Sequence, residues 1–271
     1  MRKVEAIQPR TIPESLHVAM QAGNSQAWKR RDSSFTVRSR SFQKTVPIQS
    51  LSVCPDASFA PCCLAMRQIC LILLAIFSLL NAGCGDSHVG RGYEPQVGDV
   101  IFQSFPHSPL TDAIETVSRS SYSHCGMIVR TAFGFRVLEA IGPVTTTSLD
   151  DWIQRGRNHG FAVYRLRPAY SKQLTAFVDA AKGFVGRPYD IHFGFDDATI
   201  YCSELVFTAF KQATGENLGI VRKLGDLNWK PEEAFIRKIE NGGLPLDREM
   251  ITPKELAAAT QLELVIQRGF P

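Results

Sequence analysis

A thiol, an imidazole and a carboxylate lie in three otherwise apolar segments of the chain. Cys202 stands in Tyr201-Cys202-Ser203-Glu204-Leu205-Val206-Phe207, His124 begins the segment HCGMIVR, and Glu139 interrupts the run VLEAI. A thiol next to a base that a carboxylate orients is the arrangement of an activated cysteine nucleophile. Each of these residue types is common, so the chemistry depends on whether the fold brings the three together.

Cys202 is expected in the first turn of a helix. Apolar residues recur at helical spacing from Cys202 to about Ala213, and Gly215 ends the pattern. The unpaired N–H groups and the positive dipole end of a helix favour a thiolate, which lowers a thiol pKa from about 8.5. The backbone N–H of Cys202 would also be an oxyanion donor. The alternative is a small buried cysteine that only packs.

His124 and Glu139 are expected on one face of a β-hairpin. Residues 124–130 and 136–141 predict two strands around a turn at Gly134. Alternation places His124 with Gly126 and Ile128, and it places Glu139 on the same face. Cross-strand neighbours lie about 5 Å apart, so the carboxylate would hold the imidazole. A histidine with a purely structural role is the alternative.

Cys125 is expected to point away from His124, into the apolar core. It shares its strand face with Met127 and Val129, which predicts a packing role. If Cys202 faces His124, it should not also reach Cys125 through the sheet. This argument weakens the case for a Cys125–Cys202 disulfide.

The remaining patterns predict an α+β fold with an antiparallel sheet, because the strands form a consecutive block with helices on both sides in sequence. Strands are expected at 98–102, 161–167 and 262–267, and a loop at 186–200. Helices are expected to begin at Ser108-Pro109, at Ser171, and at the capping box of Thr252-Pro253-Lys254-Glu255. The charges of Arg155-Gly156-Arg157 predict a solvated surface.

Charge is distributed unevenly along the 271 residues, of which 44% are hydrophobic and 21% charged. Residues 1–65 hold nine Lys/Arg against four Asp/Glu, whereas the rest of the chain holds 21 against 22. The near-neutral remainder argues against nucleic-acid binding. Residues 1–65 show no apolar period and are expected to be a disordered tail or a misassigned extension.

Residues 66–84 are typical of a secretory signal. Met66-Arg67 precedes a twelve-residue apolar stretch from Ile69 to Leu80, and small residues lead to Cys84. This stretch is shorter than the roughly 20 residues of a membrane span. The end is similar to a bacterial lipobox, although Asn81 stands three places before the cysteine. We therefore expect lipidation at Cys84 and an exported protein of the cell envelope or periplasm, anchored to the membrane. A buried hydrophobic helix is the alternative.

No metal and no cofactor are expected. Five of the seven cysteines lie at or before position 84, and the predicted domain, residues 85–271, keeps only Cys125 and Cys202. It contains no CxxC motif and no Cys/His pair at zinc spacing.

The order of five segments, GDVIF, SHCGMIV, VLEA, GRPYD and YCSELVF, resembles the YaeF/YiiX group of permuted papain-like (NlpC-type) cysteine hydrolases. The resemblance covers about Gly98 to Gly215. It implies a circularly permuted fold in which the His strand precedes the Cys helix, with Cys202 as nucleophile, His124 as base and Glu139 as third member. It also implies that Tyr189 of the Gly-x-Pro-Tyr segment lines the site, where its hydroxyl would assist an oxyanion hole. We expect Tyr201 and Ser203 to contribute to substrate binding. The D-C-S-G of classical NlpC domains is Tyr201-Cys202-Ser203-Glu204 here, so the resemblance supports the scaffold better than a peptidoglycan substrate.

These observations predict an exported cysteine hydrolase that transfers an acyl group to Cys202 and then to water. The bond is either an amide in a cell-wall peptide, or an ester or amide in an acylated lipid. Relatives that resemble lecithin retinol acyltransferase keep the lipid-directed reading open. A lipoprotein that binds a fatty acid or peptide without turnover, or has a structural role only, is the alternative outside the enzymes. The oligomeric state is not predicted.

Overall fold

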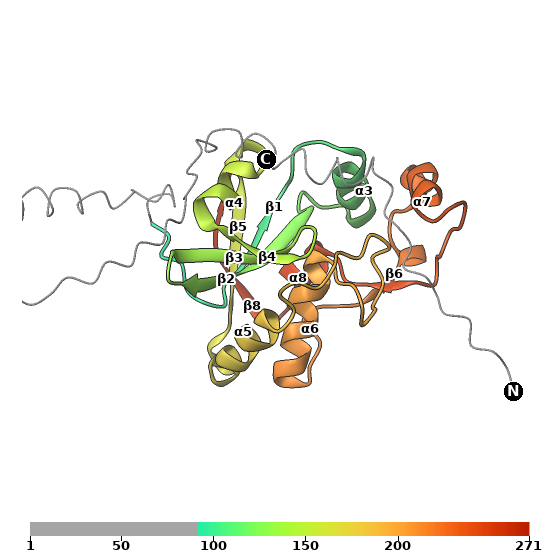
Figure 1. Cartoon of the computed structure of the whole chain (residues 1–271). Helices are drawn as coiled ribbons and strands as arrows, with labels where there is room; N and C mark the ends of the chain where they lie inside the picture. Colours follow the sequence, from blue (N-terminus) through green and yellow to red (C-terminus); the bar gives the residue numbers. More distant parts are fainter. Residues whose placement is uncertain (1–91, 271) are drawn as a thin grey trace, which may run out of the picture. The chain divides into compact units, whose positions relative to one another are not determined.

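The computed structural model describes residues 92–270, which form a six-stranded antiparallel sheet with helices packed against it (Figure 1). The strand order is β4-β3-β2-β1-β5-β8, and every neighbouring pair is antiparallel. The predicted α+β class with an antiparallel sheet is therefore confirmed. The strands are β1 (Val100–Gln103), β2 (His124–Thr131), β3 (Gly134–Ala140), β4 (Val144–Ser148), β5 (Phe161–Leu166) and β8 (Leu262–Arg268), and a separate ribbon pairs β6 (Arg222–Lys223) with β7 (Glu249–Met250).

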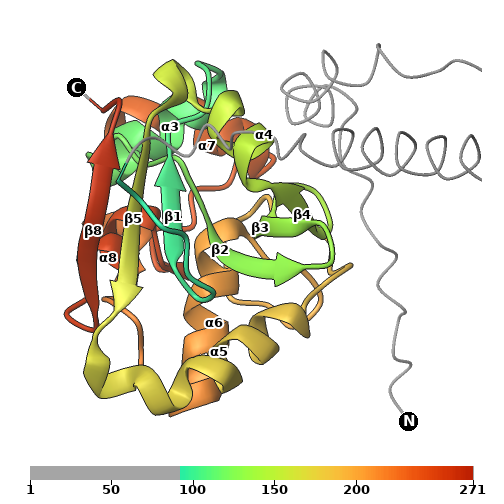
Figure 2. The same ribbon diagram turned by 90° about the vertical axis from the view of Figure 1, so that its left-hand side faces the viewer.

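Helices pack on both faces of the sheet. Residues of α5 and α6 share one buried cluster with β1 and β2, whereas Trp152 and Ile153 of α4 share a second cluster with Ile101 and Ile128. Figure 2 shows α6 behind the central strands, with α5 below. The α-helices are α3 (Pro109–Ser118), α4 (Leu149–Arg155), α5 (Leu174–Lys182), α6 (Cys202–Thr214), α7 (Glu233–Ile239) and α8 (Pro253–Ala257), and the 3-10 helices are η2 (Arg157–His159), η3 (Pro168–Gln173), η4 (Leu224–Asp226) and η5 (Lys230–Glu232).

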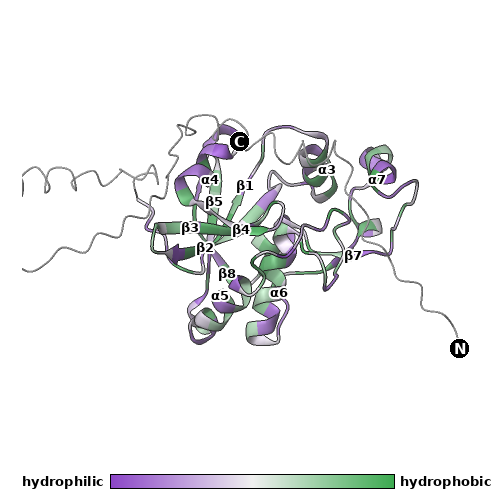
Figure 3. Cartoon of the chain, viewed as in Figure 1, coloured by the Kyte–Doolittle hydropathy of each residue, from purple (hydrophilic) through white to green (hydrophobic). Residues whose placement is uncertain are grey.

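The apolar patterns of β2 and α6 determine which residues are buried. Alternate residues of β2 enter the two clusters, with Cys125, Met127 and Val129 facing α6 and Ile128 facing α4, as the alternation predicted. The buried face of α6 includes Leu205, Val206, Ala209 and Phe210. Figure 3 shows this concentration of apolar residues along the central strands and α6. The core thus holds the start of α6 against β2.

Most predicted elements are present, with two differences. The helix expected from Ser171 begins instead at Leu174, because residues 168–173 form the 3-10 helix η3. Strand β4, helix α4 and the ribbon of β6 and β7 were not predicted. β4 is short and rich in threonine, and Ser148 serves as the N-cap of α4 by accepting a hydrogen bond from the Asp151 N–H.

The predicted signal segment 66–84 with Cys84, and the extension 1–65, lie outside the described residues. Among residues 92–270, no helix has both the length and the apolar character needed to cross a membrane.

Gly126 lets β2 and β3 lie close together. A Cβ atom at this position would lie 2.5 Å from Val137 Cγ1 and 2.7 Å from the Leu138 carbonyl oxygen. Contacts this short involve backbone, so the strands would have to move apart. We expect Gly126→Ala to lower the free energy of unfolding by about 1–3 kcal/mol, the usual cost of overpacking.

Chemical denaturation measures this effect, and Gly142→Ala is the matched control. A Cβ at Gly142 meets nothing within 4 Å, so that variant should unfold at the same denaturant concentration as the unsubstituted protein. Equal stabilities of the two variants would contradict the close approach of β2 and β3.

Candidate active site

Cys202 is the first residue of α6, as the sequence predicted. Tyr201 precedes it in an extended conformation, with φ −105° and ψ 173°, and its N–H donates to the Glu204 carboxylate at 3.3 Å. The first N–H groups of a helix have no partner within the helix, and they carry its positive dipole end. The Cys202 side chain is therefore placed where a thiolate is stabilised, and only 3% of the residue is exposed.

His124 is the first residue of β2, and its ring is fixed by contacts on two sides. It stacks on Phe105 with ring centroids 4.5 Å apart and planes 21° from parallel. Its Nε2 lies 2.6 Å from Glu139 Oε2. The other ring nitrogen, Nδ1, is thereby left for Cys202.

Glu139 reaches His124 along a diagonal of the hairpin. The register pairs Met127 with Leu138, so the residue directly opposite Glu139 is Gly126, two positions from His124. A diagonal neighbour is further away than a direct one, but a long side chain can span the gap. The absence of a side chain at Gly126 leaves this path open.

The Glu139 carboxylate is completely buried and accepts three further hydrogen bonds. Oε1 accepts from Thr147 Oγ1 at 2.5 Å, and Oε2 accepts from Trp152 Nε1 at 2.9 Å and from Arg155 Nη2 at 2.6 Å. Burial alone would raise the pKa of Glu139, but the charge of Arg155 and the hydrogen bond with His124 lower it to about 2. The carboxylate is therefore ionised at neutral pH.

Arg155 corrects the prediction that the Arg155-Gly156-Arg157 segment is a solvated surface. Its side chain is only 10% exposed, because the guanidinium pairs with Glu139 and lies over the Phe105 ring. Arg157 of the same segment was also expected to be solvated, but its guanidinium pairs with Glu115. Arg155, Trp152 and Thr147 come from β4 and α4, which sequence reasoning missed, so no partner for Glu139 other than His124 was predicted.

The proximity of Cys202 to the first residues of β2 shifts the pKa values of both Cys202 and His124. The neighbouring Cys125 and His124 lower the pKa of Cys202 well below its ordinary value, although burial opposes them. Burial would lower the pKa of His124, but hydrogen bonds to Cys202 and Glu139 raise it. These opposite shifts favour a thiolate–imidazolium pair.

Cys125 corrects a second prediction. It faces α6 as expected, and Cys125 and Cys202 are both free thiols. However, Cys202 lies in the same buried cluster as Cys125, and His124 also influences its pKa, so the sheet does not keep Cys202 away from Cys125. The reason is that α6 begins at the end of the strand, where the sheet does not separate a residue on one face from its neighbour on the other.

Tyr201 and Ser203 bind the backbone on either side of Cys202. The Tyr201 hydroxyl accepts from the Ile251 N–H at 2.9 Å, and the Ser203 hydroxyl donates to the Ile251 carbonyl at 2.7 Å. These two bonds fix the start of α6 to the segment after β7. The backbone of Tyr189 bridges to Ile200, and burial, followed by the nearby charge of Cys202, raises the pKa of Tyr189 well above its ordinary value.

A pocket lies against the nucleophile, with about 750 Å³ of space including the part open to solvent. Tyr201, Cys202 and Ser203 line it, whereas Tyr189 does not. Its walls are mainly apolar side chains from two helices, Leu110, Ile114 and Val117 of α3 and Phe235, Ile236 and Ile239 of α7. The site can therefore bind an apolar group beside Cys202.

The charged residues of the pocket are paired with one another. Arg248 donates to both Glu240 oxygens, at 2.5 and 2.9 Å, and His192 Nδ1 lies 3.0 Å from Glu240 Oε1. This leaves the pocket without an unpaired charge among these three residues, which suits an uncharged ligand.

The low pKa of Glu139 predicts a pH-dependent contribution to stability. Its pKa is about 2 in the folded protein against 4.5 ordinarily, so the ionised form stabilises the fold above about pH 4.5 and this stabilisation is lost as the pH falls toward 2. We expect Glu139→Gln to unfold at lower denaturant concentration at pH 7. The difference from the unsubstituted protein should narrow between pH 4.5 and 2.

Denaturant midpoints measured from pH 8 down to pH 3 test this expectation. The control is Glu249→Gln, which neutralises an exposed carboxyl. A difference for Glu139→Gln that stays constant with pH would show that the carboxylate is not held ionised.

Known proteins are similar to this chain in sequence and in fold. Residues 94–266 match the family described as permuted papain-like amidase enzyme, YaeF/YiiX, C92 family. The uncharacterized protein YiiX of Escherichia coli K12 is 34% identical over 176 residues, which cover 64% of this chain and 87% of YiiX. A crystal structure titled metalloprotein yiiX, from Escherichia coli O157:H7, is similar with a TM-score of 0.62 and 32% identity, over 66% of this chain and all of that one. The chain thus belongs to the permuted papain-like amidases of the YaeF/YiiX family.

Proposed function

We propose that this protein is an exported cysteine hydrolase of the amidase or peptidase class, in which Cys202 is the nucleophile, His124 the base and Glu139 the group that orients it. The observation that carries the proposal is a buried His124–Glu139 pair close to Cys202, which itself lines an apolar pocket. Nε2 of His124 is bound to Glu139 at 2.6 Å, and Cys202 lines the pocket from the start of α6. Membership of an amidase family supports the hydrolase class.

Acylation begins with the thiolate of Cys202. Sγ attacks the carbonyl carbon of the substrate, and the carbonyl π electrons move onto oxygen to give a tetrahedral oxyanion. The backbone N–H of Cys202 is the donor proposed for this oxygen, because helix-start N–H groups are unpaired. The imidazolium of His124 then gives its Nδ1 proton to the leaving nitrogen, the C–N bond breaks, and a thioester to Cys202 remains.

Deacylation uses the same groups in reverse. Nδ1 of neutral His124 takes a proton from water as the water oxygen attacks the thioester carbonyl. Collapse of the second tetrahedral species breaks the C–S bond, releases the carboxylic acid and restores the thiolate beside the imidazolium. Glu139 holds the ring orientation throughout and stabilises its charged form without taking the proton.

A similar solved structure is titled a metalloprotein, so the arrangement of possible ligand side chains in this protein matters. Among residues 92–270, no group of three or more His, Cys, Asp and Glu side chains is arranged so that it could hold a metal ion. Nε2 of His124 is already bound to Glu139. The described residues do not fit a metal, and the proposed steps use protein groups and water.

The cellular location of the protein is also proposed, and this part of the proposal rests on the sequence. Residues 66–84 have the form of a signal segment that ends at Cys84. We propose export to the cell envelope and lipid anchoring at Cys84. The domain then acts on a substrate at or near a membrane surface.

The pocket favours a second candidate substrate, an ester or amide in an acylated lipid. The walls from α3 and α7 are apolar, and Arg248, Glu240 and His192 neutralise one another at the pocket. A peptide substrate would leave its polar backbone against these walls, which costs free energy. An acyl chain buries apolar surface there instead.

The thiolate–imidazolium pair predicts that Cys202 reacts at low pH. Because the pKa of Cys202 is lowered partly by His124, iodoacetamide should alkylate Cys202 fully below pH 7 in the full chain. In His124→Ala the midpoint should rise toward about 8.5. Peptide-resolved mass spectrometry separates Cys202 from the other six cysteines. Identical alkylation midpoints near pH 8.5 in both proteins would contradict the proposal that Cys202 is an activated nucleophile.

The pocket predicts how the rate depends on the acyl group. For anilides with acyl chains of increasing length, kcat/KM should rise about fourfold per added methylene until the pocket is full, because each buried methylene contributes about 0.8 kcal/mol. Ile114→Asp, in the α3 wall, should abolish this rise. The control is Ile220→Asp, at a residue 59% exposed.

The outcomes separate the candidate functions. Hydrolysis that does not depend on acyl length would favour peptide amides over acyl lipids. Binding of long-chain analogues without turnover, while Cys202 is unreactive below pH 7, would contradict the enzyme and favour a binding lipoprotein.

A further inference from the structure

Phe193 adopts a backbone conformation that is unusual for a bulky side chain. Its φ angle is 55°, in the left-handed region that glycine and asparagine adopt more readily. The residue lies in the segment between α5 and α6, and it lines the pocket together with Cys202. A conformation of this kind costs free energy and persists only where the surrounding contacts determine it, which occurs mainly at functional sites. The place of Phe193 in the pocket wall therefore points to a role in the function of the site.

Hydrogen bonds hold the peptide groups on both sides of Phe193. The Asp190 carboxylate accepts from the His192 N–H at 2.8 Å and, through its other oxygen, from the Gly194 N–H at 2.7 Å. Arg248 Nη1 donates to the His192 carbonyl oxygen at 2.6 Å. Only 5% of Asp190 is exposed, so its carboxylate is largely shielded from water. These bonds form a clamp, made by Asp190 and Arg248, that fixes the strained backbone.

The ring of Phe193 packs between two tyrosine rings. Its centroid lies 6.2 Å from that of Tyr189, with the planes 88° apart, and 5.4 Å from that of Tyr201, with the planes 71° apart. Edge-to-face pairs of this kind are favourable. Tyr201 directly precedes Cys202, and both line the pocket. The Phe193 ring is thus held against the part of the wall that carries the nucleophile.

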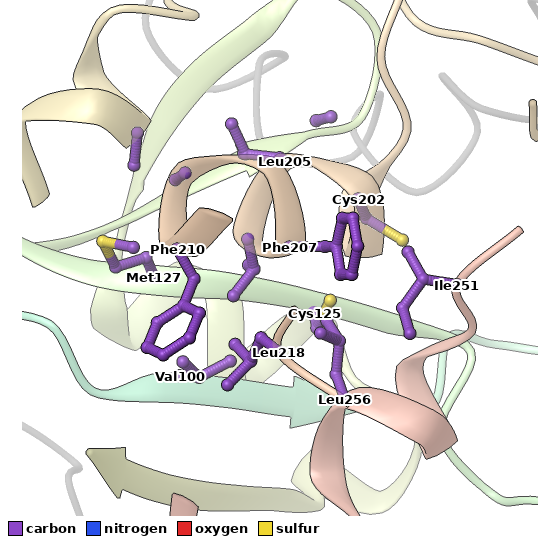
Figure 4. Close-up of a cluster of buried hydrophobic side chains, with 14 of the residues drawn as sticks. Val100, Cys125, Met127, Cys202, Leu205, Phe207, Phe210, Leu218, Ile251 and Leu256 are labelled. Carbon is purple, nitrogen blue, oxygen red and sulfur yellow. The ribbon is translucent and has the colours of Figure 1, made fainter. Parts of the chain in front are cut away.

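The Cys202 sulfur faces the same part of the wall. Figure 4 shows this sulfur turned toward Ile251. The Ile251 N–H donates to the Tyr201 hydroxyl at 2.9 Å, and Ile251 lines the pocket with Phe193. An acyl group on the sulfur has its carbonyl carbon at Cys202 and its next carbon one bond further away. That next carbon meets the wall near Cys202, whereas the α3 and α7 walls remain for the rest of a chain.

The carbon next to the carbonyl distinguishes the two candidate substrate classes. In a fatty acyl group it is a CH₂ group. In a peptide of chiral amino acids it carries a nitrogen and a side chain. A rigid aromatic wall beside this carbon accepts the first class and rejects the second, because a closely packed contact leaves no room for a further substituent.

We propose that Phe193 is a specificity-determining residue of the pocket: its ring, held by the clamp, restricts the acyl group that reaches Cys202 to one without a substituent on the carbon next to the carbonyl. The proposal rests on the proposed function of Cys202 and deepens it, because it selects acyl lipids over peptides. The strain at Phe193 is the cost of keeping the ring in this place.

The experiment compares two anilide substrates that differ by one methyl group. Octanoyl anilide is unbranched, and 2-methyloctanoyl anilide carries the methyl group next to the carbonyl. In the unsubstituted full chain, kcat/KM should be at least about tenfold higher for octanoyl anilide, the discrimination that one additional carbon produces in a closely packed pocket. Phe193→Gly removes the ring and permits the backbone conformation, so this ratio should fall by about the same factor.

Two further variants complete the comparison. Phe195→Gly is the matched control, because Phe195 is 40% exposed, packs on Phe207 and lies outside the described lining of the pocket. Its ratio should equal that of the unsubstituted protein. Asp190→Asn keeps the ring but removes one carboxylate acceptor of the clamp, so its ratio should fall. This variant keeps the test decisive if the Phe193 variants do not fold. An unchanged ratio in Phe193→Gly or in Asp190→Asn would overturn the proposal.

A stability measurement tests the strained conformation without turnover. Glycine normally makes a protein less stable than alanine does at the same position, because glycine has more freedom in the unfolded state. At Phe193 the positive φ reverses this order, so Phe193→Gly should unfold at higher denaturant concentration than Phe193→Ala. Phe195 does not have a positive φ, and its glycine variant should be the less stable one. The same order at both positions would contradict the strained wall.

The results also separate this inference from the proposed function. Hydrolysis that responds to acyl length but not to the 2-methyl group leaves the hydrolase intact and removes only the role of Phe193. No hydrolysis of either anilide, together with a Cys202 alkylation midpoint of about pH 8.5 in the unsubstituted protein, removes both.

Discussion

One ionised carboxylate, buried on strand β3, determines how the site is built. Glu139 is fully buried, and an unpaired charge there would be prohibitively costly. Thr147, Trp152, His124 and Arg155 supply its four hydrogen bonds, and the guanidinium supplies the opposite charge. The residues that satisfy Glu139 therefore come from β2, β4 and α4, so the imidazole is oriented only when this half of the sheet is complete.

Rigid elements rather than loops carry the proposed chemistry. His124 lies between Glu139 and the Phe105 ring at the start of β2, and Cys202 begins α6. The side chains on either side of Cys202 both bind Ile251. The catalytic distances thus depend on how α6 packs against β2, and the core residues of both elements set that packing. The pocket walls come from α3 and α7, whose Val117 and Ile236 pack against this core.

Periodicity was sufficient to predict the elements that bear His124, Glu139 and Cys202, because each lies in a strong apolar pattern. It predicted the wrong environment for Arg155 and Cys125. A charge next to Gly156 is typical of a surface, and only the tertiary pairing with Glu139 shows that Arg155 is buried. Strand alternation does send Cys125 and His124 to opposite faces, but at the end of the strand, beside the start of α6, the sheet no longer separates the two faces. The threonine-rich β4 has no apolar alternation, so neither it nor the partners of Glu139 that follow it were found.

The central claim is that Glu139, His124 and Cys202 act as one charged chain, and ¹⁵N NMR of the His124 ring tests it most directly. The ring should be doubly protonated at pH 7, because Glu139 and the thiolate raise its pKa. Alkylation of Cys202 removes the thiolate and should lower the pKa of His124, and a His124→Ala sample assigns the signal. A ring that is neutral at pH 7 and does not respond to alkylation would contradict the account.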